Sequence, residues 1–182
     1  DPGGSESPLF RREFSVRPRL VRATIHVSGL GQYELFANDR KVGDDVLSPG
    51  WTKYDKTVLY DTRDLTPFLQ PGTNAIGMML GKGMYRVDGG RYTKFTGSFG
   101  ALTAIAQLHL EYQDGTSEVI TSDDRWRTAA GPITFSCVYG GEDYDTRREP
   151  HGWSTAGFDD SVWQPAAVTE GPGGALRGFS SA

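Results

Sequence analysis

The residues that could do chemistry are densest towards the C-terminal end of the chain. Residues 140–166, GGEDYDTRREPHGWSTAGFDDSVWQPA, combine several carboxylates with two tryptophans and a histidine. Two carboxyl groups that lie roughly 5 to 9.5 Å apart can act as acid and base in glycoside cleavage. Glu142, Asp143 and Asp145 are the candidates for such a pair.

The same segment also fits a purely structural role. Arg147 and Arg148 stand beside its acids, and the ion pairs that they form would fix the exit of a strand. The residues after them would wrap back as an irregular cover with three buried aromatic side chains, those of Trp153, Phe158 and Trp163. We expect this structural role to dominate.

The acid pair Asp159 and Asp160 in GFDDSVW has two interpretations. A carboxylate at this position can accept hydrogen bonds from backbone N–H groups in an Asx turn, which is the more common arrangement. Alternatively, the pair could hold a structural calcium ion. His151, on the same stretch, is expected at the surface.

Two long loops carry the residue types of a carbohydrate site. Residues 42–57 contain Asp44, Asp45 and Trp51, and residues 81–100 are dense in Gly, Tyr, Arg and Lys. Sugar recognition needs aromatic faces for C–H surfaces and a few fixed polar groups for hydroxyls, and the two loops supply both. The alternative is that the loop aromatics only cap the end of a hydrophobic core.

Short strands must position these loops. In residues 20–28, LVRATIHVS, apolar and polar residues alternate, which is the pattern of a half-buried strand. The apolar face of that strand comprises Val21, Ala23, Ile25 and Val27. Further strands are predicted at QYELFAN, TVLYDT, NAIGMML, TAIAQLHLEY, SEVIT and ITFSCVY, separated by turn sequences such as PGTN and QDGT.

The fold that these strands predict is all-β. Asn38 and Asp39 tolerate left-handed backbone angles and would turn one strand into the next as a hairpin. No segment has the pattern of an amphipathic helix, and strands do not alternate with helices as in a parallel sheet. We therefore expect an antiparallel β-sandwich of the jelly-roll kind, with function carried by its loops.

Length and composition bound the function. The chain has 182 residues and a net charge of -4, with Lys and Arg interspersed among the acids, so nucleic-acid binding is not expected. No apolar run approaches the roughly 20 residues of a membrane helix, so we expect no membrane partner. Cys137 is the single cysteine, which excludes an internal disulfide. We expect one monomeric domain at residues 10–170, between Gly/Ser/Pro-rich flanks at 1–9 and 171–182.

Two stretches together resemble a known family. FANDRKVGDDVLSPGWTKYDKTVLYDTRDLTPFLQPGTNAIGMMLGKGMY and GGEDYDTRREPHGWSTAGFDDSVWQPA are similar to the N-terminal accessory domain of bacterial-type α-L-rhamnosidases, which overlaps the rhamnose-binding carbohydrate-binding module family 67. DLTPFLQPGTNAIG and GFDDSVW alone also resemble the sugar-binding jelly-roll domains of β-galactosidase-type enzymes. The combination of VGDDVLSPGWT with GGEDYDTRREPHGW is what indicates the rhamnosidase group.

The resemblance implies a galactose-binding-like β-sandwich that is attached to a catalytic domain without containing it. Binding members of the family hold terminal L-rhamnose with the help of a calcium ion. Asp44 and Asp45 would be its side-chain ligands, and backbone carbonyl groups around Thr96 to Ala101 would complete the shell. The sugar itself would contact Asp44, Asp45, Trp51, Tyr85, Arg91, Tyr92 and Lys94.

Two features of the loops bear on this ligand set. Side chains of adjacent extended residues point in opposite directions, so Asp44 and Asp45 can both bind the ion only if the loop turns, which Gly43 permits. The second loop, GKGMYRVDGGRYTKFTGSFG, departs from the commonest family pattern, which has a tryptophan and an Arg-Gly run there.

We therefore expect a secreted, non-catalytic module that binds terminal L-rhamnose with calcium and targets an attached enzyme to rhamnose-containing plant polysaccharide. The alternative is a structural accessory domain of an α-L-rhamnosidase or related polysaccharide lyase, which binds no sugar and exposes an apolar patch when it is separated from its partner. A free-standing glycosidase is not expected, because a lone sandwich has little material for a deep subsite and catalysis in the family belongs to another domain.

Overall fold

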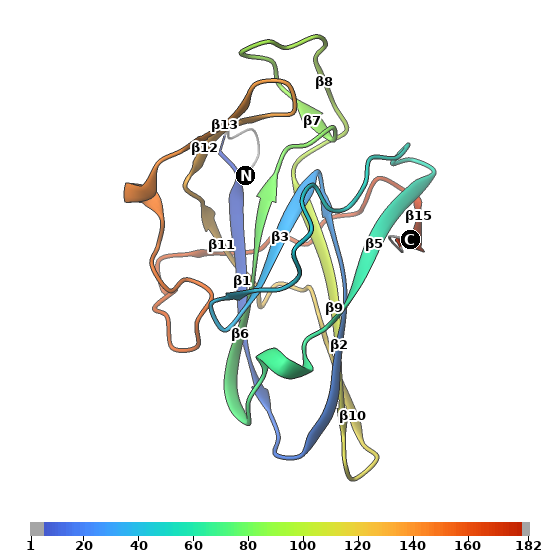
Figure 1. Ribbon diagram of the computed structural model, residues 1–182, viewed down its shortest axis with the longest axis vertical. Coiled ribbons are helices and arrows are strands. Elements are labelled where there is room, and N and C mark those ends of the chain that lie inside the picture. Colours follow the sequence, from blue (N-terminus) through green and yellow to red (C-terminus); the bar gives the residue numbers. More distant parts are fainter. Residues whose placement is uncertain (1–5, 180–182) are drawn as a thin grey trace.

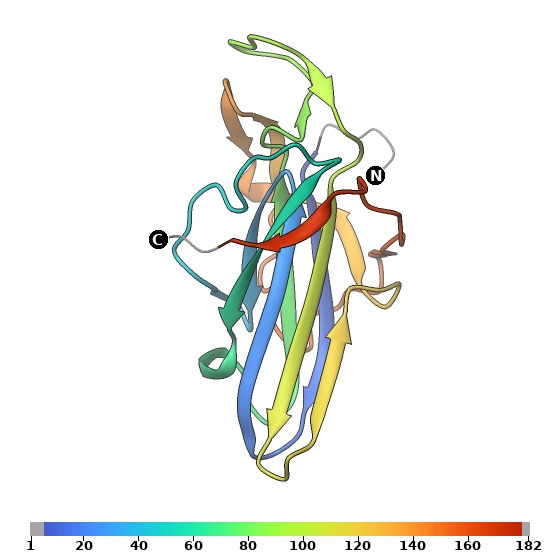
Figure 2. The same cartoon turned by 90° about the vertical axis from the view of Figure 1, so that its right-hand side faces the viewer.

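Two β-sheets pack face to face around a hydrophobic core (Figures 1 and 2). The structure is a computed structural model and describes residues 6–179. Helical turns in this part are limited to η1 (Thr66–Phe68) and η2 (Thr146–Arg148), and no helix among these residues is long and apolar enough to span a membrane. The expected all-β sandwich is confirmed, while its jelly-roll topology stays a prediction.

The first sheet has six strands in the order β14-β11-β1-β6-β3-β4, and its neighbours are all antiparallel. These strands are β1 (Pro8–Val16), β3 (Gln32–Ala37), β4 (Arg40–Lys41), β6 (Gly72–Gly81), β11 (Arg127–Ala130) and β14 (Gln164–Pro165). Asn38 and Asp39 have φ values of 48° and 63°. The predicted hairpin turn between β3 and β4 is therefore confirmed.

The second sheet has five strands in the order β10-β9-β2-β5-β15. These are β2 (Leu20–Leu30), β5 (Thr57–Asp64), β9 (Thr103–Tyr112), β10 (Ser117–Thr121) and β15 (Ala175–Gly178). Two small hairpins stand at one end of the sandwich, formed by β7 (Arg86–Val87) with β8 (Gly97–Ser98) and by β12 (Ile133–Cys137) with β13 (Gly141–Tyr144). Figure 1 shows both hairpins at the top of the molecule.

Alternate residues of the strands fill the core between the two sheets. Three of the four predicted core residues of β2 are fully buried: Ala23, Ile25 and Val27. The fourth, Val21, is 58% exposed, so this part of the prediction is wrong. The reason is a register shift between Leu20 and Arg22 in the pairing of β2 with β9, which changes the face that a side chain occupies.

β15 differs from the other strands because it pairs in parallel with β5, from Ala175↔Thr57 to Gly178↔Tyr60. In Figure 2 this strand, in red, passes across the front of the second sheet, of which it is the edge strand beside β5. Just before it, a Cβ atom on Gly174 would lie 2.2 Å from the carbonyl oxygen of Tyr54, so only glycine fits there. The backbone at 174–178 therefore holds the C-terminal end of the loop at residues 42–57.

Candidate functional site

The carboxylate-rich segment at residues 140–166 is held by ion pairs, as the sequence predicts. Arg147 pairs with Asp145 at 2.7 Å, and Arg148 pairs with Glu6 at 2.7 Å. Hydrogen bonds from Arg147 lower the pKa of Asp145 to about 2. Two of the three candidate catalytic acids are thus paired with arginine, because Asp143 also accepts a hydrogen bond from Arg91 at 2.8 Å.

The cover formed by the later part of this segment lies on Arg11. This side chain is 1% exposed, and it donates to the carbonyl oxygens of Trp153 (2.8 Å) and Thr155 (2.9 Å). It also pairs with the carboxylates of Glu13 (2.8 Å) and Asp160. The cover is therefore attached to the middle of the first sheet by one buried guanidinium group.

Two of the three aromatic side chains expected to be buried in the cover, Trp153 and Trp163, are buried, whereas Phe158 is half-buried. Trp153 is 4% exposed and Trp163 is 6% exposed, and their rings stack with centroids 6.4 Å apart. Phe158 packs edge-on against Trp163 and is partly buried. Asp159 accepts a hydrogen bond from the backbone N–H of Ser161 at 3.0 Å, which confirms the Asx turn.

The two loops predicted to form a sugar site meet at the end of the sandwich. Tyr54 of the first loop, residues 42–57, packs edge-on against Tyr85 and Phe99 of the second loop, residues 81–100, with ring centroids 5.0 and 5.2 Å apart. Burial raises the pKa of Tyr54 to about 12 and also raises the pKa of Tyr85. Tyr85 is 4% exposed and donates to the carbonyl oxygen of Phe99, so it joins the loops from within.

The two predicted metal-binding aspartates have different surroundings. Asp45 forms an ion pair with Arg63 at 2.5 Å, and Arg63 also lies 3.6 Å from the carboxylate of Asp61. Asp44 is exposed, and it forms no ion pair with any residue between 6 and 179. Gly43 has a φ of 82°, so the loop does turn at the predicted position.

The tip of the second loop packs against the β12–β13 hairpin. The guanidinium of Arg91 lies over the ring of Phe135 at 4.7 Å, in addition to its bond to Asp143. The ammonium of Lys94 lies 5.9 Å from the ring of Tyr139. Two of the seven predicted sugar contacts, Arg91 and Lys94, therefore already contact this hairpin, whereas Tyr92, which lies between them in the sequence, is 86% exposed.

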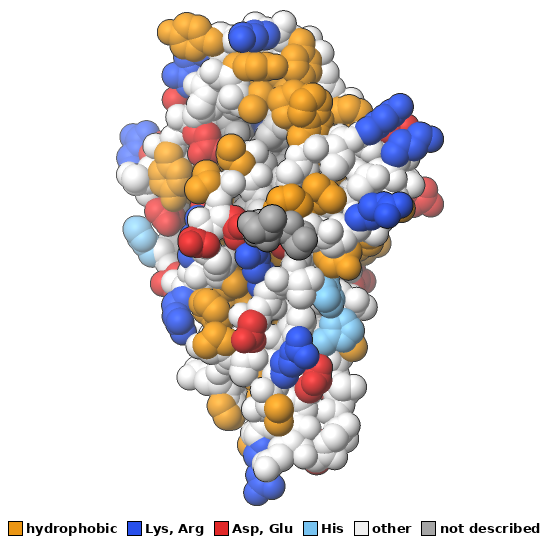
Figure 3. All heavy atoms as spheres, turned by 45° about the vertical axis from the view of Figure 1, so that its right-hand side comes forward, with side chains coloured by type: hydrophobic (Ala, Val, Ile, Leu, Met, Phe, Trp, Pro, Cys, Tyr) orange, Lys and Arg blue, Asp and Glu red, His pale blue; other side chains and the backbone are white. Residues whose placement is uncertain are grey.

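Exposed aromatic side chains gather at this end of the molecule. Figure 3 shows hydrophobic atoms clustered at its upper end, the end that carries β7 and β8. The exposed aromatics of the two loops are Trp51 (66%), Tyr92 (86%), Phe95 (44%) and Phe99 (54%). Such accessible rings can stack on the apolar faces of sugar rings.

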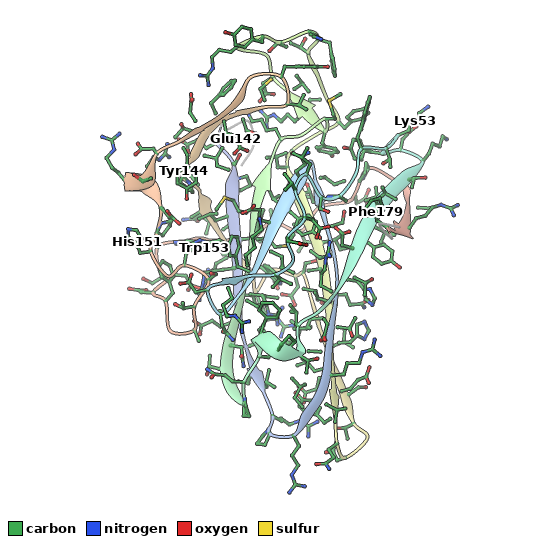
Figure 4. All side chains as sticks on the ribbon, viewed as in Figure 1. Lys53, Glu142, Tyr144, His151, Trp153 and Phe179 are labelled. Carbon is green, nitrogen blue, oxygen red and sulfur yellow. The ribbon has the colours of Figure 1, made fainter. Side chains whose placement is uncertain are left out.

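A groove of about 610 Å³ lies between the first loop and the β12–β13 hairpin, over the outer face of the first sheet. Figure 4 shows four of its residues in the left half of the view, with Glu142 and Tyr144 on the hairpin and His151 and Trp153 below them. The first loop contributes Asp45, Val46 and Leu47, and the start of the second loop contributes Gly81 and Gly83. We call this hollow the sheet groove.

Sequence reasoning did not place Glu142 and Tyr144 in a binding surface. Partial burial and the neighbouring Glu34 raise the pKa of Glu142. Burial and the Glu149 carboxylate raise the pKa of Tyr144 to about 12. The spacing of Glu142 and Tyr144 by two residues on a strand is the available signal, because it puts both side chains on one face.

A second hollow, of about 710 Å³, lies where the segment at residues 166–176 passes the start of β9. Its lining includes Ile105, Val168 and Leu176, whose exposed fractions are 46%, 73% and 52%. Ala101, a predicted calcium ligand, lines this hollow and not the sheet groove that Asp45 lines. The structure therefore brings the loops together but divides their predicted ligands between two surfaces.

The donors around Asp44 fit calcium in kind, since they are oxygen atoms on exposed loops. Among residues 6–179, however, no three His, Cys, Asp or Glu side chains are grouped so as to hold a metal ion. Asp45 is neutralised by Arg63, and the carbonyl oxygen of Ala101 accepts a hydrogen bond from Thr103 at 2.9 Å. Thr96 is exposed. A calcium ion here would depend on Asp44, backbone oxygens and the ligand.

A family model described as the alpha-L-rhamnosidase N-terminal domain matches residues 18–182. The chain belongs to this family. An α-L-rhamnosidase of Streptomyces avermitilis is 43% identical over 164 residues, and one of Formosa agariphila is 36% identical over 174 residues. The two matches cover 89% and 91% of this chain, but only 16% and 18% of the length of the relatives. This rhamnosidase N-terminal domain therefore corresponds to less than a fifth of each relative.

Solved structures agree with this assignment. The α-L-rhamnosidase of Dictyoglumus thermophilum superposes with a TM-score of 0.86 at 41% identity, over 95% of this chain and 19% of that one. The Streptomyces avermitilis α-L-rhamnosidase, crystallised in complex with L-rhamnose, gives 0.86 at 38% identity, over 95% and 17%. A Pleurotus ostreatus lectin, at 19% identity and a TM-score of 0.58 over 94% and 40%, shares the fold alone with this rhamnosidase N-terminal domain.

Proposed function

We propose that this domain is a non-catalytic carbohydrate-binding module of a larger α-L-rhamnosidase and that it binds terminal L-rhamnose with the help of calcium. The observation that carries the proposal is the meeting of the two loops through Tyr54, Tyr85 and Phe99. Through this contact the exposed ring of Phe99 packs against the first loop, which also carries the exposed carboxylate of Asp44, and aromatic rings and carboxylates are the components of a sugar site.

The non-catalytic part of the proposal rests on the acids and on chain length. Asp143 and Asp145 are held by arginines, which leaves Glu142 without a free partner among the three candidates. The domain also spans less than a fifth of the length of its curated rhamnosidase relatives, so the remaining four fifths offer ample material for catalysis. One structural relative was crystallised with L-rhamnose, which supports the choice of sugar.

Calcium would be held mainly by Asp44, with Asp45 joining if it releases Arg63, and with backbone oxygens between Thr96 and Ala101. When bound, calcium supplies a charge to which two neighbouring sugar hydroxyls can coordinate. Trp51 and Tyr92 would provide the stacking faces. Since polysaccharides are met outside the cell, the proposal implies that the parent protein is secreted and that its partner is rhamnose-terminated plant polysaccharide.

Calorimetric titration of L-rhamnose tests the proposal, once with millimolar calcium and once with a chelator. We expect a dissociation constant of about 0.01 to 1 mM with calcium and no binding without it. Asp44→Ala should abolish binding with an unchanged melting temperature, whereas Asp114→Ala, on a distant exposed turn, should bind normally. Silence with L-rhamnose, L-fucose and D-galactose in both conditions would refute the proposal.

The second candidate function is a structural domain that supports the rest of the enzyme and binds no sugar. The apolar hollow at Ile105, Val168 and Leu176 favours it, because an exposed apolar surface fits a partner domain. This function predicts no heat with any sugar. It also predicts that Leu176→Glu, in the full-length enzyme, lowers the melting temperature of the whole enzyme more than that of the isolated domain.

A further inference from the structure

We propose that the sheet groove is an extension subsite, which takes neutral sugar units next to the terminal rhamnose and rejects uronate units. The inference rests on the proposed function, because the groove begins at the loops that would hold rhamnose. It goes further by assigning a second binding surface and a class of polysaccharide.

Continuity with the loops is the first argument. Asp45, Val46 and Leu47 belong to the first loop and form one wall of the groove. Gly81 and Gly83 lie at the start of the second loop and line one end of the groove. A glycan whose last unit lies on the loops can therefore continue over the first sheet without leaving the surface. The volume of about 610 Å³ lies within the usual range of small-molecule sites and exceeds the need of one sugar ring.

The lining has the chemistry of a sugar subsite. Tyr144 is 45% exposed and presents an accessible ring at the wall formed by β13, and Phe36 contributes a second apolar surface. Gln32, Ser136 and His151 add hydrogen-bonding groups on three different elements. This mixture of aromatic and polar groups suits a ligand with apolar C–H faces and many hydroxyls.

The charge of the groove selects among sugars. Its lining contains five carboxylates and no lysine or arginine among the described residues: Glu34, Asp39, Asp45, Glu142 and Glu149. Lys41 and Arg63 neutralise Glu34 and Asp45 from outside the lining, but no lysine or arginine within residues 6–179 pairs with Glu142 or Glu149. Carboxylates accept hydrogen bonds from neutral hydroxyls, whereas they repel the carboxylate of a uronate. Neutral glycans are thus the class that fits.

The test compares three ligands by calorimetry with calcium present: L-rhamnose, a rhamnosyl disaccharide of a neutral hexose, and the same disaccharide with a uronic acid in place of the hexose. We expect the neutral disaccharide to bind about 3- to 10-fold more tightly than L-rhamnose, as one added aromatic contact would give. We expect the uronate disaccharide to bind about 3- to 10-fold more weakly than its neutral counterpart.

Variants assign these differences to the groove. Tyr144→Ala should remove the gain from the second sugar and leave the affinity for L-rhamnose unchanged, whereas Tyr60→Ala on the second sheet should change neither. Glu142→Gln combined with Glu149→Gln removes the two carboxylates that have no cationic partner, and this double variant should bring the affinity for the uronate disaccharide close to that for the neutral one. Melting temperatures of all variants establish that they are folded.

The outcomes separate this inference from the proposed function. If L-rhamnose binds with calcium but the neutral disaccharide binds no more tightly, or Tyr144→Ala keeps the gain, the groove is not a subsite and the proposed function stands. If the uronate disaccharide binds more tightly than the neutral one, the assigned sugar class is wrong. If L-rhamnose and both disaccharides fail to bind, the inference and the proposed function are both overturned.

Discussion

Replacing Arg11 by methionine keeps much of the volume of the side chain and removes every hydrogen bond that it donates. Arg11 is 1% exposed and serves four acceptors, namely two carbonyl groups of the cover and the carboxylates of Glu13 and Asp160. Removing one partner of a fully buried ion pair costs about 3–5 kcal/mol. The two carboxylates are 35% and 28% exposed, so water can reach them in the variant and the cost falls towards the lower end of that range.

The carbonyl oxygens add to this cost. Trp153 is buried, and its carbonyl group would lose the donor that Arg11 supplies, which typically costs about 1–3 kcal/mol. Because these contributions overlap, we expect Arg11→Met to lower the free energy of unfolding by about 3–4 kcal/mol. For a chain of this size the melting temperature should fall by roughly 6 to 16 °C.

Thermal and urea unfolding followed by tryptophan fluorescence measure this change directly, since Trp153 and Trp163 lie in the cover. Arg147→Met is the matched control, because Arg147 also pairs with an acid of the same segment but is 87% exposed. That variant should stay within about 1 kcal/mol of the wild type. Equal losses in the two variants, or a loss below 1 kcal/mol for Arg11→Met, would refute the view that a buried guanidinium holds the cover.

Two further predictions concern the same frame. Gly77→Ala places a Cβ atom 2.3 Å from the ring of Trp153, so we expect that ring to shift, with a loss of about 1–3 kcal/mol and a changed near-ultraviolet circular dichroism spectrum; an unchanged spectrum would contradict this packing. Burial opposes ionisation of Asp88, yet hydrogen bonds from Lys82 and Arg86 hold its pKa below the ordinary value. A lowered folded pKa means that the stabilisation is complete above the unfolded pKa of about 4 and is lost as pH falls through the folded value. Asp88→Asn should therefore lower the melting temperature at pH 7 and narrow the gap to wild type below pH 4, and a gap that does not depend on pH would show that this ion pair does not couple to folding.

The strands with regular alternation were predictable from the sequence, and those without it were not. TAIAQLHLEY and SEVIT match β9 and β10 residue for residue. The sequence pattern did not predict β1, because Arg11 and Arg12 are adjacent and both buried, at 1% and 7% exposure. Two neighbouring charged residues do not have the pattern of a central strand, and their burial depends on partners distant in the sequence, among them Asp160 and Asp123.

The sequence predicted which two loops form the candidate site, but not how the side chains of these loops are arranged in space. Glycine and aromatic content pointed to residues 42–57 and 81–100, and the structure does join them. The engagement of Arg91 by Asp143 depends on a contact between residues 52 positions apart, which no local pattern contains. The sheet groove likewise exists only because the β12–β13 hairpin folds next to the first loop.

The parallel pairing of β15 has a consequence for where this domain can be cut. Composition alone places residues 171–182 in a flank, yet Ala175–Gly178 covers the outer side of β5. A version ending at residue 171 would keep every core residue and both loops, but the N–H and C=O groups of β5 that face β15 would lose their partners, while those that face β2 would stay paired. An exposed strand edge of that kind invites pairing with a second molecule. Such a truncated domain should self-associate, even though nothing in its core has been removed.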